Sequence, residues 1–313
     1  MLLVEVLGGP DAETVAAQLR AMDSAGLVWV TTRPSQPACP SVAGLVVAAP
    51  STLAASTPAE FETVADVILR DGEPLHDQVA RLYRLRISAF AAVLAGQPQV
   101  SSAVVLRPYD ARWASAAGRY LDRLRAALAT VGASEGTKLE HIGSTAVPGL
   151  RAKAIVDLQM QVPELRHDAE LDKALHSVGF CPAVGSRPDS PGVHRDIPRG
   201  SDSVMDHVWD KRLFMRPDPG QPSILHIRKE ASPWARYTIL FCDWLRQHPA
   251  ERMRYQQTKS ELAGAHAGDL DYDDYTRAKT AYFDDVQAQL DKYGREAAIT
   301  PPFASPLTRR PRR

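Results

Sequence analysis

Residues 139–160 read LEHIGSTAVPGLRAKAIVDLQM, and this stretch decides the fold of the larger part of the chain. The stretch begins inside a short predicted strand at residues 138–142, and the chain then turns at Gly143 and Ser144. Residues 154–162 form a second strand, in which apolar and polar side chains alternate with a period of two. We therefore predict that this strand presents the carboxylate of Asp157 next to a glycine–serine turn.

The turn and the strand together have the residue types of a phosphate and metal site. Glycine lets the backbone approach a ligand closely, and successive amides with the hydroxyls of Ser144 and Thr145 can surround a phosphate. Mg²⁺ takes oxygen ligands, which Asp157, substrate phosphates and water can supply. Lys153 is placed to neutralise a phosphate. Glycine–serine turns and strand aspartates also occur for purely structural reasons, so both explanations stay open.

The second unit, residues 104–296, combines strands with helices and ends in helices alone. Asp110 is expected to cap a helix, and Ser232 followed by proline is a strong helix start. The pattern predicts an α+β fold in which a mixed sheet is followed by C-terminal helices. We expect strands at 138–142, 154–162, 205–209, 213–216 and 224–228, and helices that start at Asp110, Leu171, Ser232, Pro249 and Asp271.

The first unit, residues 1–99, alternates short apolar strands with helices, which predicts a small P-loop-like parallel α/β unit. Glycines follow its first strand, but Pro10 removes an amide donor there and Glu13 stands near the position that needs a lysine. A glutamate would repel a phosphate. The expected strands are 4–7, 27–31, 42–48 and 64–69, with a loop at 34–40, a helix capped by Asp11 and a long helix at 75–94.

The bulk properties are those of an ordinary globular protein. The chain has 313 residues, which suggests two domains at roughly 100–200 residues each. Its 37 basic and 37 acidic residues cancel, so there is no strong nucleic-acid signal and no global attraction to an anionic membrane. Three scattered cysteines fit a reducing compartment, and we expect a cytoplasmic protein without a signal peptide or membrane span. Residues 297–313 are expected to be a disordered basic tail.

Other polar residues have two open interpretations. His226 and Arg228 share one face of the strand at 224–228, where Arg228 can act as a fork for phosphate. His141 is as well explained as a buried histidine with a hydrogen-bond partner as by catalysis. Asp206 and His207 either complete a site or have only a structural role.

A wider resemblance depends on residues 140–150, 152–153 and 155–159, which are similar to the signature of the GrpB family. That family belongs to the DNA polymerase beta-like nucleotidyltransferase superfamily, so a nucleotidyltransferase-type mixed sheet is implied. The resemblance runs from Val104 to about Tyr293. It also includes 108–113, 225–228, 241–249, Tyr255 with Lys259, and Tyr275 with Lys279.

The resemblance implies nucleotidyl transfer from a nucleoside triphosphate to a small acceptor, with Mg²⁺ on Asp157. It implies catalytic roles for Asp157, His226 and Arg228, and nucleotide binding by Gly143, Ser144, Thr145 and Lys153. The superfamily pattern places a second acid where this chain has Gln159, and a third on a later strand. An amide and an imidazole cannot replace two carboxylates around a pair of Mg²⁺ ions, so one metal or another ligand set is implied.

The ends of the first unit, residues 3–9 and 65–72, resemble dephospho-CoA kinase, but the unit has only about half the length of such a kinase. This resemblance implies a degenerate domain. Three hypotheses follow: a nucleotidyltransferase, a non-catalytic nucleotide-binding or accessory folding module of a dephospho-CoA kinase-type fusion, and a residual dephospho-CoA kinase. The last is disfavoured because the phosphate-loop lysine is absent.

Overall fold

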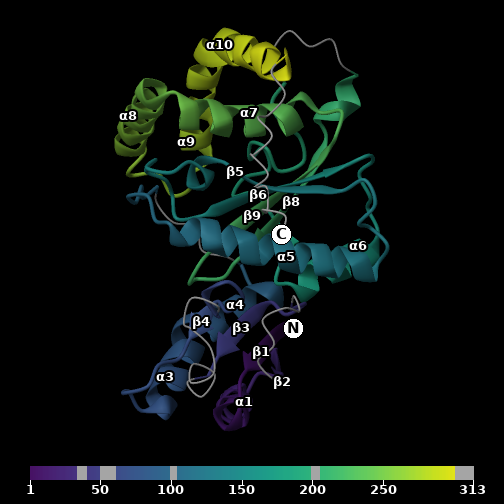
Figure 1. Cartoon of the computed structure of the whole chain (residues 1–313), viewed down its shortest axis with the longest axis vertical. Coiled ribbons are helices and arrows are strands. Elements are labelled where there is room, and N and C mark those ends of the chain that lie inside the picture. The colour runs from purple at the N-terminus through teal and green to yellow at the C-terminus, as the bar shows by residue number, and fades with distance from the viewer. Residues whose placement is uncertain (34–40, 50–60, 99–103, 199–204, 300–313) are drawn as a thin grey trace, which may run out of the picture.

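The computed structural model describes residues 1–33, 41–49, 61–98, 104–198 and 205–299. It contains two separate β-sheets, one of four strands and one of five. Figure 1 shows the smaller sheet at one end of the molecule, the larger sheet in the middle, and the C-terminal helices at the other end. Within these ranges, no helix combines the length and the apolarity that crossing a membrane requires.

The N-terminal unit is a parallel sheet with the strand order β2-β1-β3-β4, which confirms the predicted parallel α/β unit. The strand at Leu45–Ala48 is apolar and buried on both faces, as expected where helices cover a parallel sheet. The P-loop-like character of this unit stays a prediction. The elements are β1 (Leu2–Leu7), α1 (Pro10–Met22), β2 (Val28–Arg33), β3 (Leu45–Ala48), β4 (Val67–Ile68), α3 (Leu75–Leu82), the π-helical η2 (Tyr83–Ile87) and α4 (Ser88–Leu94).

Several boundaries in this unit differ from the prediction. Helix α1 begins at Pro10 with Gly9 at its N-cap, so Asp11 lies inside the first turn and its predicted capping role was wrong. Proline suits the first helical position because it has no amide hydrogen to lose there. The strand predicted at 64–69 shrinks to two residues. The loop predicted at 34–40 lies outside the described residues.

The second sheet has the order β5-β6-β9-β8-β7, in which only the β6–β9 pair is parallel. The predicted mixed sheet is confirmed. The strand predicted at 205–209 was wrong: Asp206–Trp209 is a 3₁₀ helix, η4, in which Asp206 and His207 are exposed while Val208 and Trp209 are buried. The strands are β5 (Lys138–Ile142), β6 (Val156–Val162), β7 (Cys181–Pro182), β8 (Lys211–Arg216) and β9 (Ser223–Lys229).

Helices cover both faces of this sheet (Figure 1). The apolar face of β6 packs on α5 (Arg112–Thr130) and α6 (Ala169–Ser177), as its alternation predicts. The C-terminal helices cover the face that carries Asp157. They are α7 (Pro233–Gln247), α8 (Pro249–Ala265), α9 (Asp273–Ala278) and α10 (Thr280–Ile299).

The C-terminal end also corrects the prediction. The single last helix expected from Asp271 is in fact two, α9 and α10, which meet at Lys279. Helix α10 includes residues 297–299, so the predicted tail begins too early, and residues 300–313 lie outside the described part of the chain.

A buried charge cluster joins the two units. Asp66, which lies just before β4, is fully buried, and its carboxylate is 2.7 Å from Arg123, 3.3 Å from Arg119 and 3.6 Å from Arg216. Burial by itself would raise the pKa of Asp66, but the guanidinium groups of Arg123, Arg216 and Arg119 outweigh it and hold that pKa well below its usual value. The carboxylate of Asp66 therefore stays charged and attaches the first unit to α5 and β8.

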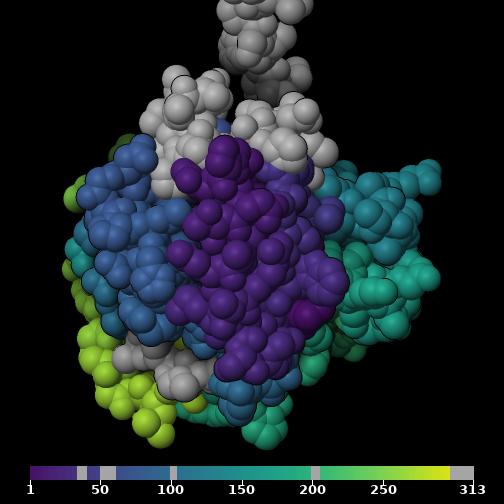
Figure 2. Space-filling view, turned by 90° about the horizontal axis from the view of Figure 1, so that it is seen from below, coloured from purple at the N-terminus to yellow at the C-terminus, as the bar shows by residue number. Residues whose placement is uncertain are grey.

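A second set of contacts extends this interface. Arg86 of η2 forms a two-pronged pair with Asp218, at 2.6 and 2.7 Å. Arg216 donates to the carbonyl of Gly44 at 2.6 Å, and the backbones of Gly44 and Gly179 lie against each other. Figure 2 shows the same end of the molecule covered by the first unit, in purple and blue. The two units therefore share one continuous interior.

We expect Asp66→Asn to lower the free energy of unfolding by about 3–5 kcal/mol, because it leaves buried guanidinium groups without a counter-charge. Urea denaturation of the full chain measures the change. Asp77→Asn is the matched control, since Asp77 is exposed on α3 and should change stability by less than about 0.5 kcal/mol. Equal stability of the two variants would contradict a structural role for Asp66.

Candidate functional site

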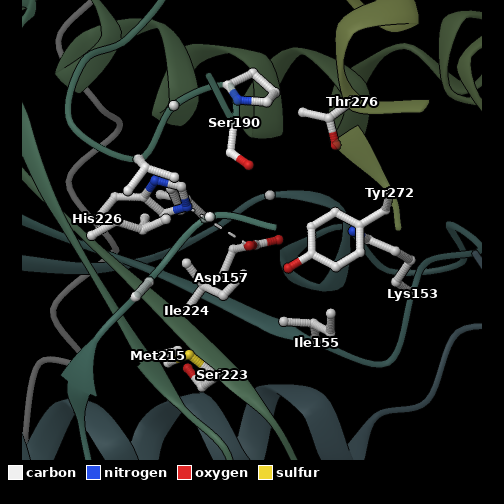
Figure 3. A pocket seen from close by; sticks show the side chains of 18 of the residues that line it. Lys153, Ile155, Asp157, Ser190, Met215, Ser223, Ile224, His226, Tyr272 and Thr276 are labelled. Carbon is white, nitrogen blue, oxygen red and sulfur yellow. Dashed lines mark ion pairs between the residues drawn. The ribbon is translucent and has the colours of Figure 1, made fainter. Parts of the chain in front are cut away.

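A cavity of about 1420 Å³ lies between the second sheet and the C-terminal helices. Asp157 of β6 points into it from the sheet. Figure 3 shows His226 on one side of Asp157 and Tyr272 on the other, with Ser190 and Thr276 across the cavity. The cavity is large enough for a nucleotide-sized ligand.

The glycine–serine turn lies directly against Asp157, as predicted. Ile142, the last residue of β5, pairs with Asp157 in the sheet, so the turn that follows passes over the carboxylate. Gly143 has φ +72°, and a Cβ atom placed on it would lie 2.5 Å from Asp157 Oδ2. A glycine is required here for two reasons: the backbone conformation and the lack of space for a side chain.

His226 approaches Asp157 from the parallel neighbour strand β9. Its Nε2 lies 3.9 Å from Asp157 Oδ1. Its Nδ1 lies 3.1 Å from Lys211 Nζ and 3.3 Å from Arg228 Nη2. Lysine and arginine only donate, so Nδ1 accepts and the ring hydrogen is on Nε2, directed at Asp157.

The charge states around this pair follow from burial and from neighbouring groups. Burial lowers the pKa of His226 to about 4, helped by the cations of Lys211 and Arg228, so the ring is neutral. Burial would raise the pKa of Asp157, but hydrogen bonding from His226 and the charge of Lys153 outweigh it, so that pKa is lowered. Asp157 therefore presents a carboxylate to the cavity.

Gln159, which stands where a second acid was expected, is part of the structure. Its amide nitrogen donates to Glu140 at 3.2 Å and to the carbonyl of Ala235 at 2.9 Å. Its amide oxygen accepts from Arg228 at 2.8 Å and from Thr238 at 3.0 Å. All four of its hydrogen-bonding positions are in use, so it does not offer a ligand to a metal ion.

Asp196 is the acid that approaches β9, and it is also occupied. Arg228 donates to it at 2.6 and 3.0 Å, and Lys211 donates at 3.0 Å. No group of three His, Cys, Asp or Glu side chains in the described ranges is arranged to hold a metal ion. The carboxylate of Asp273 also lines the cavity, but Ser190 donates to it. Asp157 is therefore the carboxylate that the sheet offers to a ligand, and the described residues lack the acid set of a two-metal centre.

Three lysines surround the turn and Asp157. Lys153 and Lys279 line the cavity, while Lys259 of α8 lies behind the turn and donates to Ser144 Oγ at 3.0 Å. Burial and the charge of a second nearby lysine together lower the pKa of Lys259 to about 7 and that of Lys279 to about 7. The arrangement favours an anionic ligand, because Asp157 is the one carboxylate that attracts all three lysines.

A loop closes the cavity from the side of α9. Arg187 pairs with Asp271 at 3.0 Å and with Asp274 at 2.9 Å. These contacts hold the loop that carries Ser190 against the segment that carries Thr276 (Figure 3). This loop and the sheet therefore form two sides of the cavity.

The structure brings most of the sequence-predicted site residues together. Thr145 is an exception, because its hydroxyl lies 3.0 Å from His141 Nε2 and its buried side chain is not part of the cavity wall. Burial lowers the pKa of His141 to about 4, as for a histidine of the interior. The residues that do line the cavity are Gly143, Ser144, Lys153, Asp157, His226 and Arg228.

The pair Asp206 and His207 does not join the site. Both residues are exposed on η4, and Asp206 pairs with Arg195. Arg228 is not free to bind a phosphate with both arms of its guanidinium group, since that group already donates to Asp196 and Gln159.

Sequence reasoning missed several residues of the site. Lys211 and Asp196 come from separate segments, and no local pattern connects them with His226. A signal did exist for Lys259 and Lys279: each follows a tyrosine by four residues, which places ring and ammonium on one helical face. The structure confirms the contacts, with Lys259 4.8 Å from the ring of Tyr255 and Lys279 4.8 Å from that of Tyr275.

Comparisons with known proteins match this chain to one family model and to several individual proteins. The GrpB protein family model matches residues 103–289. A dephospho-CoA kinase from Mycolicibacterium paratuberculosis is 30% identical over 71% of this chain and 55% of its own length. A second, from Mycobacterium leprae, is 31% identical over 67% of this chain and 53% of its own length. The chain thus spans about half the length of these relatives.

Two further relatives lack the kinase name. A UPF0157 protein from Streptomyces coelicolor is 31% identical over 56% of this chain and 77% of that protein. The crystal structure of the conserved protein GrpB from Enterococcus faecalis covers 61% of this chain and 99% of that chain, with 23% identity and a TM-score of 0.45.

We expect Gly143→Ala to destabilise the protein by about 1–3 kcal/mol, because the new methyl group collides with the carboxylate of Asp157. Gly132→Ala is the matched control, since Gly132 has φ +61° and open space around it. Urea denaturation measures both. The double variant Gly143→Ala with Asp157→Ala should recover the part of the loss that comes from the carboxylate, although the approach to the Asp157 Cβ atom, at 2.9 Å, remains. No recovery would rule out the carboxylate as a cause.

We expect His226 to remain neutral down to about pH 5, with its hydrogen on Nε2, because its pKa is about 4. Nitrogen-15 NMR of the ring measures both the tautomer and the titration. Lys211→Met should raise the pKa of His226, since it removes a neighbouring positive charge, whereas Lys173→Met at an exposed position of α6 should not. A ring that titrates near its ordinary pKa of about 6.5 would contradict the arrangement.

Proposed function

Since this chain belongs to the GrpB family, as residues 140–159 led us to expect, we propose that its cavity binds a nucleotide and transfers a nucleotidyl group to a small acceptor. The observation that carries the proposal is the close packing of the Gly143 turn against Asp157, with Lys153 and Lys279 beside it. Strand carboxylate, glycine turn and cations together suit a phosphate that must be held and attacked in a fixed position.

Each residue has a separate role in this proposal. Ser144 and the amides of the turn contact a phosphate, and Lys153 neutralises its charge. Asp157 is the catalytic carboxylate. His226 donates its Nε2 hydrogen toward Asp157 or a substrate oxygen, and Arg228 is a positioning residue that holds the imidazole and Gln159.

Magnesium fits this site only as a single ion. Asp157 would hold it, with substrate phosphates and water as the remaining ligands. The ion would supply positive charge to the phosphates when bound. A second ion does not fit, since Gln159 and Asp196 are already engaged with Arg228.

A second function has a specific observation in its favour. Gln159 and Asp196, which occupy the positions around Asp157, are held in structural hydrogen bonds. A site with so few free acids suits nucleotide binding without transfer. In that case the chain would be a non-catalytic nucleotide-binding or accessory module, and nucleotide binding without turnover would identify it.

Residual dephospho-CoA kinase activity is the least favoured proposal, although relatives have that name. The proposal concerns the N-terminal unit, where Glu13 on α1 contacts Thr32 and Arg20. A carboxylate there repels a phosphate, and a coupled assay with dephospho-CoA and ATP should show no turnover.

We expect calorimetric titration of the full chain to detect binding of at least one of ATP, GTP, CTP and UTP. Ser144→Ala and Lys153→Met should each weaken that binding about tenfold, because each removes a phosphate contact, equivalent to about 1.4 kcal/mol. Asp157→Asn should abolish any increase in affinity that Mg²⁺ produces. Lys173→Met, at an exposed position, is the control.

The result that contradicts the proposal is also clear. If none of the four nucleotides binds the folded wild-type chain, with Mg²⁺ or without it, the cavity is not a nucleotide site. If a nucleotide binds but no transfer to any tested acceptor occurs, the binding-module function is the correct one.

A further inference from the structure

Three lysines from separate segments of the chain lie in or directly behind the wall of the cavity. Lys153 precedes β6, Lys279 joins α9 to α10, and Lys259 lies on α8. Lys153 and Lys279 face the cavity directly. Lys259 stands behind Ser144, which its ammonium group contacts at 3.0 Å. The C-terminal helices thus deliver two lysines to a turn that belongs to the sheet.

The partners of these lysines are neutral. Lys153 Nζ lies 4.0 Å from the ring centre of Tyr272 and 5.8 Å from that of Tyr275. Lys279 shares the Tyr275 ring, and Lys259 also donates to the carbonyl of Arg151. Aromatic faces and carbonyl oxygens attract an ammonium group without cancelling its charge. The positive charge therefore remains available to a ligand.

The other buried cations of the described residues have negatively charged partners. Each of them forms an ion pair with a buried carboxylate, whereas none of the ion pairs in the described ranges includes Lys153, Lys259 or Lys279. The neutralised cations are Arg123 with Asp66, Arg216 with Asp66 and Asp218, and Lys211 and Arg228 with Asp196.

The carboxylates that act on the three lysines do not balance them. Asp157 attracts all three from beyond ion-pair distance, and Asp273 also attracts Lys153. Asp273 is itself hydrogen-bonded by Ser190. Burial lowers the pKa of each lysine, because burial disfavours the charged form of an ammonium group. A bound polyanion would remove that cost.

We infer that Lys153 and Lys279, with Lys259 behind Ser144, form a binding site for a linear polyphosphate chain that needs no divalent cation. Three ammonium groups would supply the positive charge that a second metal ion supplies in a two-metal centre. The inference rests on the proposed function where it takes the chain to be the triphosphate of a nucleotide. The site itself is defined by the polyphosphate alone.

The two sides of the cavity then receive different parts of the ligand. Tyr272 and Lys153 lie together on one side of Asp157, as Figure 3 shows. Ile155, Ile224 and Met215 lie on the sheet side below the carboxylate. We place the phosphates beside Tyr272 and an uncharged group of the ligand on the apolar side.

Calorimetric titration of the full chain with inorganic tripolyphosphate, in EDTA, tests the inference. We expect wild-type protein to bind, and Lys153→Met and Lys279→Met each to weaken binding at least about tenfold. Lys259→Met should have a smaller effect, because it acts through Ser144. Lys279→Arg should keep most of the affinity, and Lys173→Met is the control for general charge.

Asp157→Asn separates this inference from a metal-dependent site. Removing the charge of Asp157, which acts on all three lysines, should tighten tripolyphosphate binding in EDTA by at least about threefold. A site that needs a metal on Asp157 predicts weaker binding instead. This variant keeps the test decisive if a lysine-to-methionine variant fails to fold, since weaker binding by Asp157→Asn would overturn the inference.

The remaining outcomes distinguish the inference from the proposed function. No tripolyphosphate binding in EDTA, with nucleotide binding only in Mg²⁺, overturns the inference and leaves the proposed function in place. Tripolyphosphate binding without binding of any nucleotide supports the inference and overturns the nucleotide proposal. If neither ligand binds under any condition, both are wrong.

Discussion

The site depends on one steric constraint, the contact between the Gly143 backbone and the Asp157 carboxylate. The register of β5 on β6 places Ile142 opposite Asp157, so the chain must turn immediately above the carboxylate. That turn is possible only with a residue that tolerates φ +72° and has no side chain. The same contact brings Ser144 to the cavity wall, where Lys259 reaches it. Strand register therefore determines which groups a ligand meets.

The protein uses its buried cations in two ways. Arginines at the junction of the two units are matched by Asp66 and Asp218, and these pairs serve packing. A buried pair of this kind adds little net stability by itself, but removing one member leaves an expensive charge behind. The lysines near Asp157 rest on tyrosine rings and carbonyls, so their charge is left for another molecule.

Local patterns predicted the central strands well. The period of two in β6 correctly separated Val156 and Leu158 from Asp157, because each face of a strand meets a single environment. The segment 205–209 was predicted as a strand but contains a 3₁₀ helix, since local pattern does not reveal whether a segment pairs with a neighbouring strand. The roles of Asp196 and Lys279 depend on segments distant in sequence. Sequence spacing does not predict contacts between distant segments. It does indicate which residues share a helical face, as for a tyrosine and a lysine four residues apart.

The charge cluster around Asp66 also bears on what counts as a domain in this chain. Family comparison draws a boundary near residue 103, and the two sheets agree with it. Buried ion pairs cross this boundary, because Arg119 and Arg123 of the larger unit pair with Asp66 of the smaller one. Separating the two units at the family boundary would leave charged side chains without their ion-pair partners on both surfaces. The two units are thus held together by ion pairs that neither completes alone.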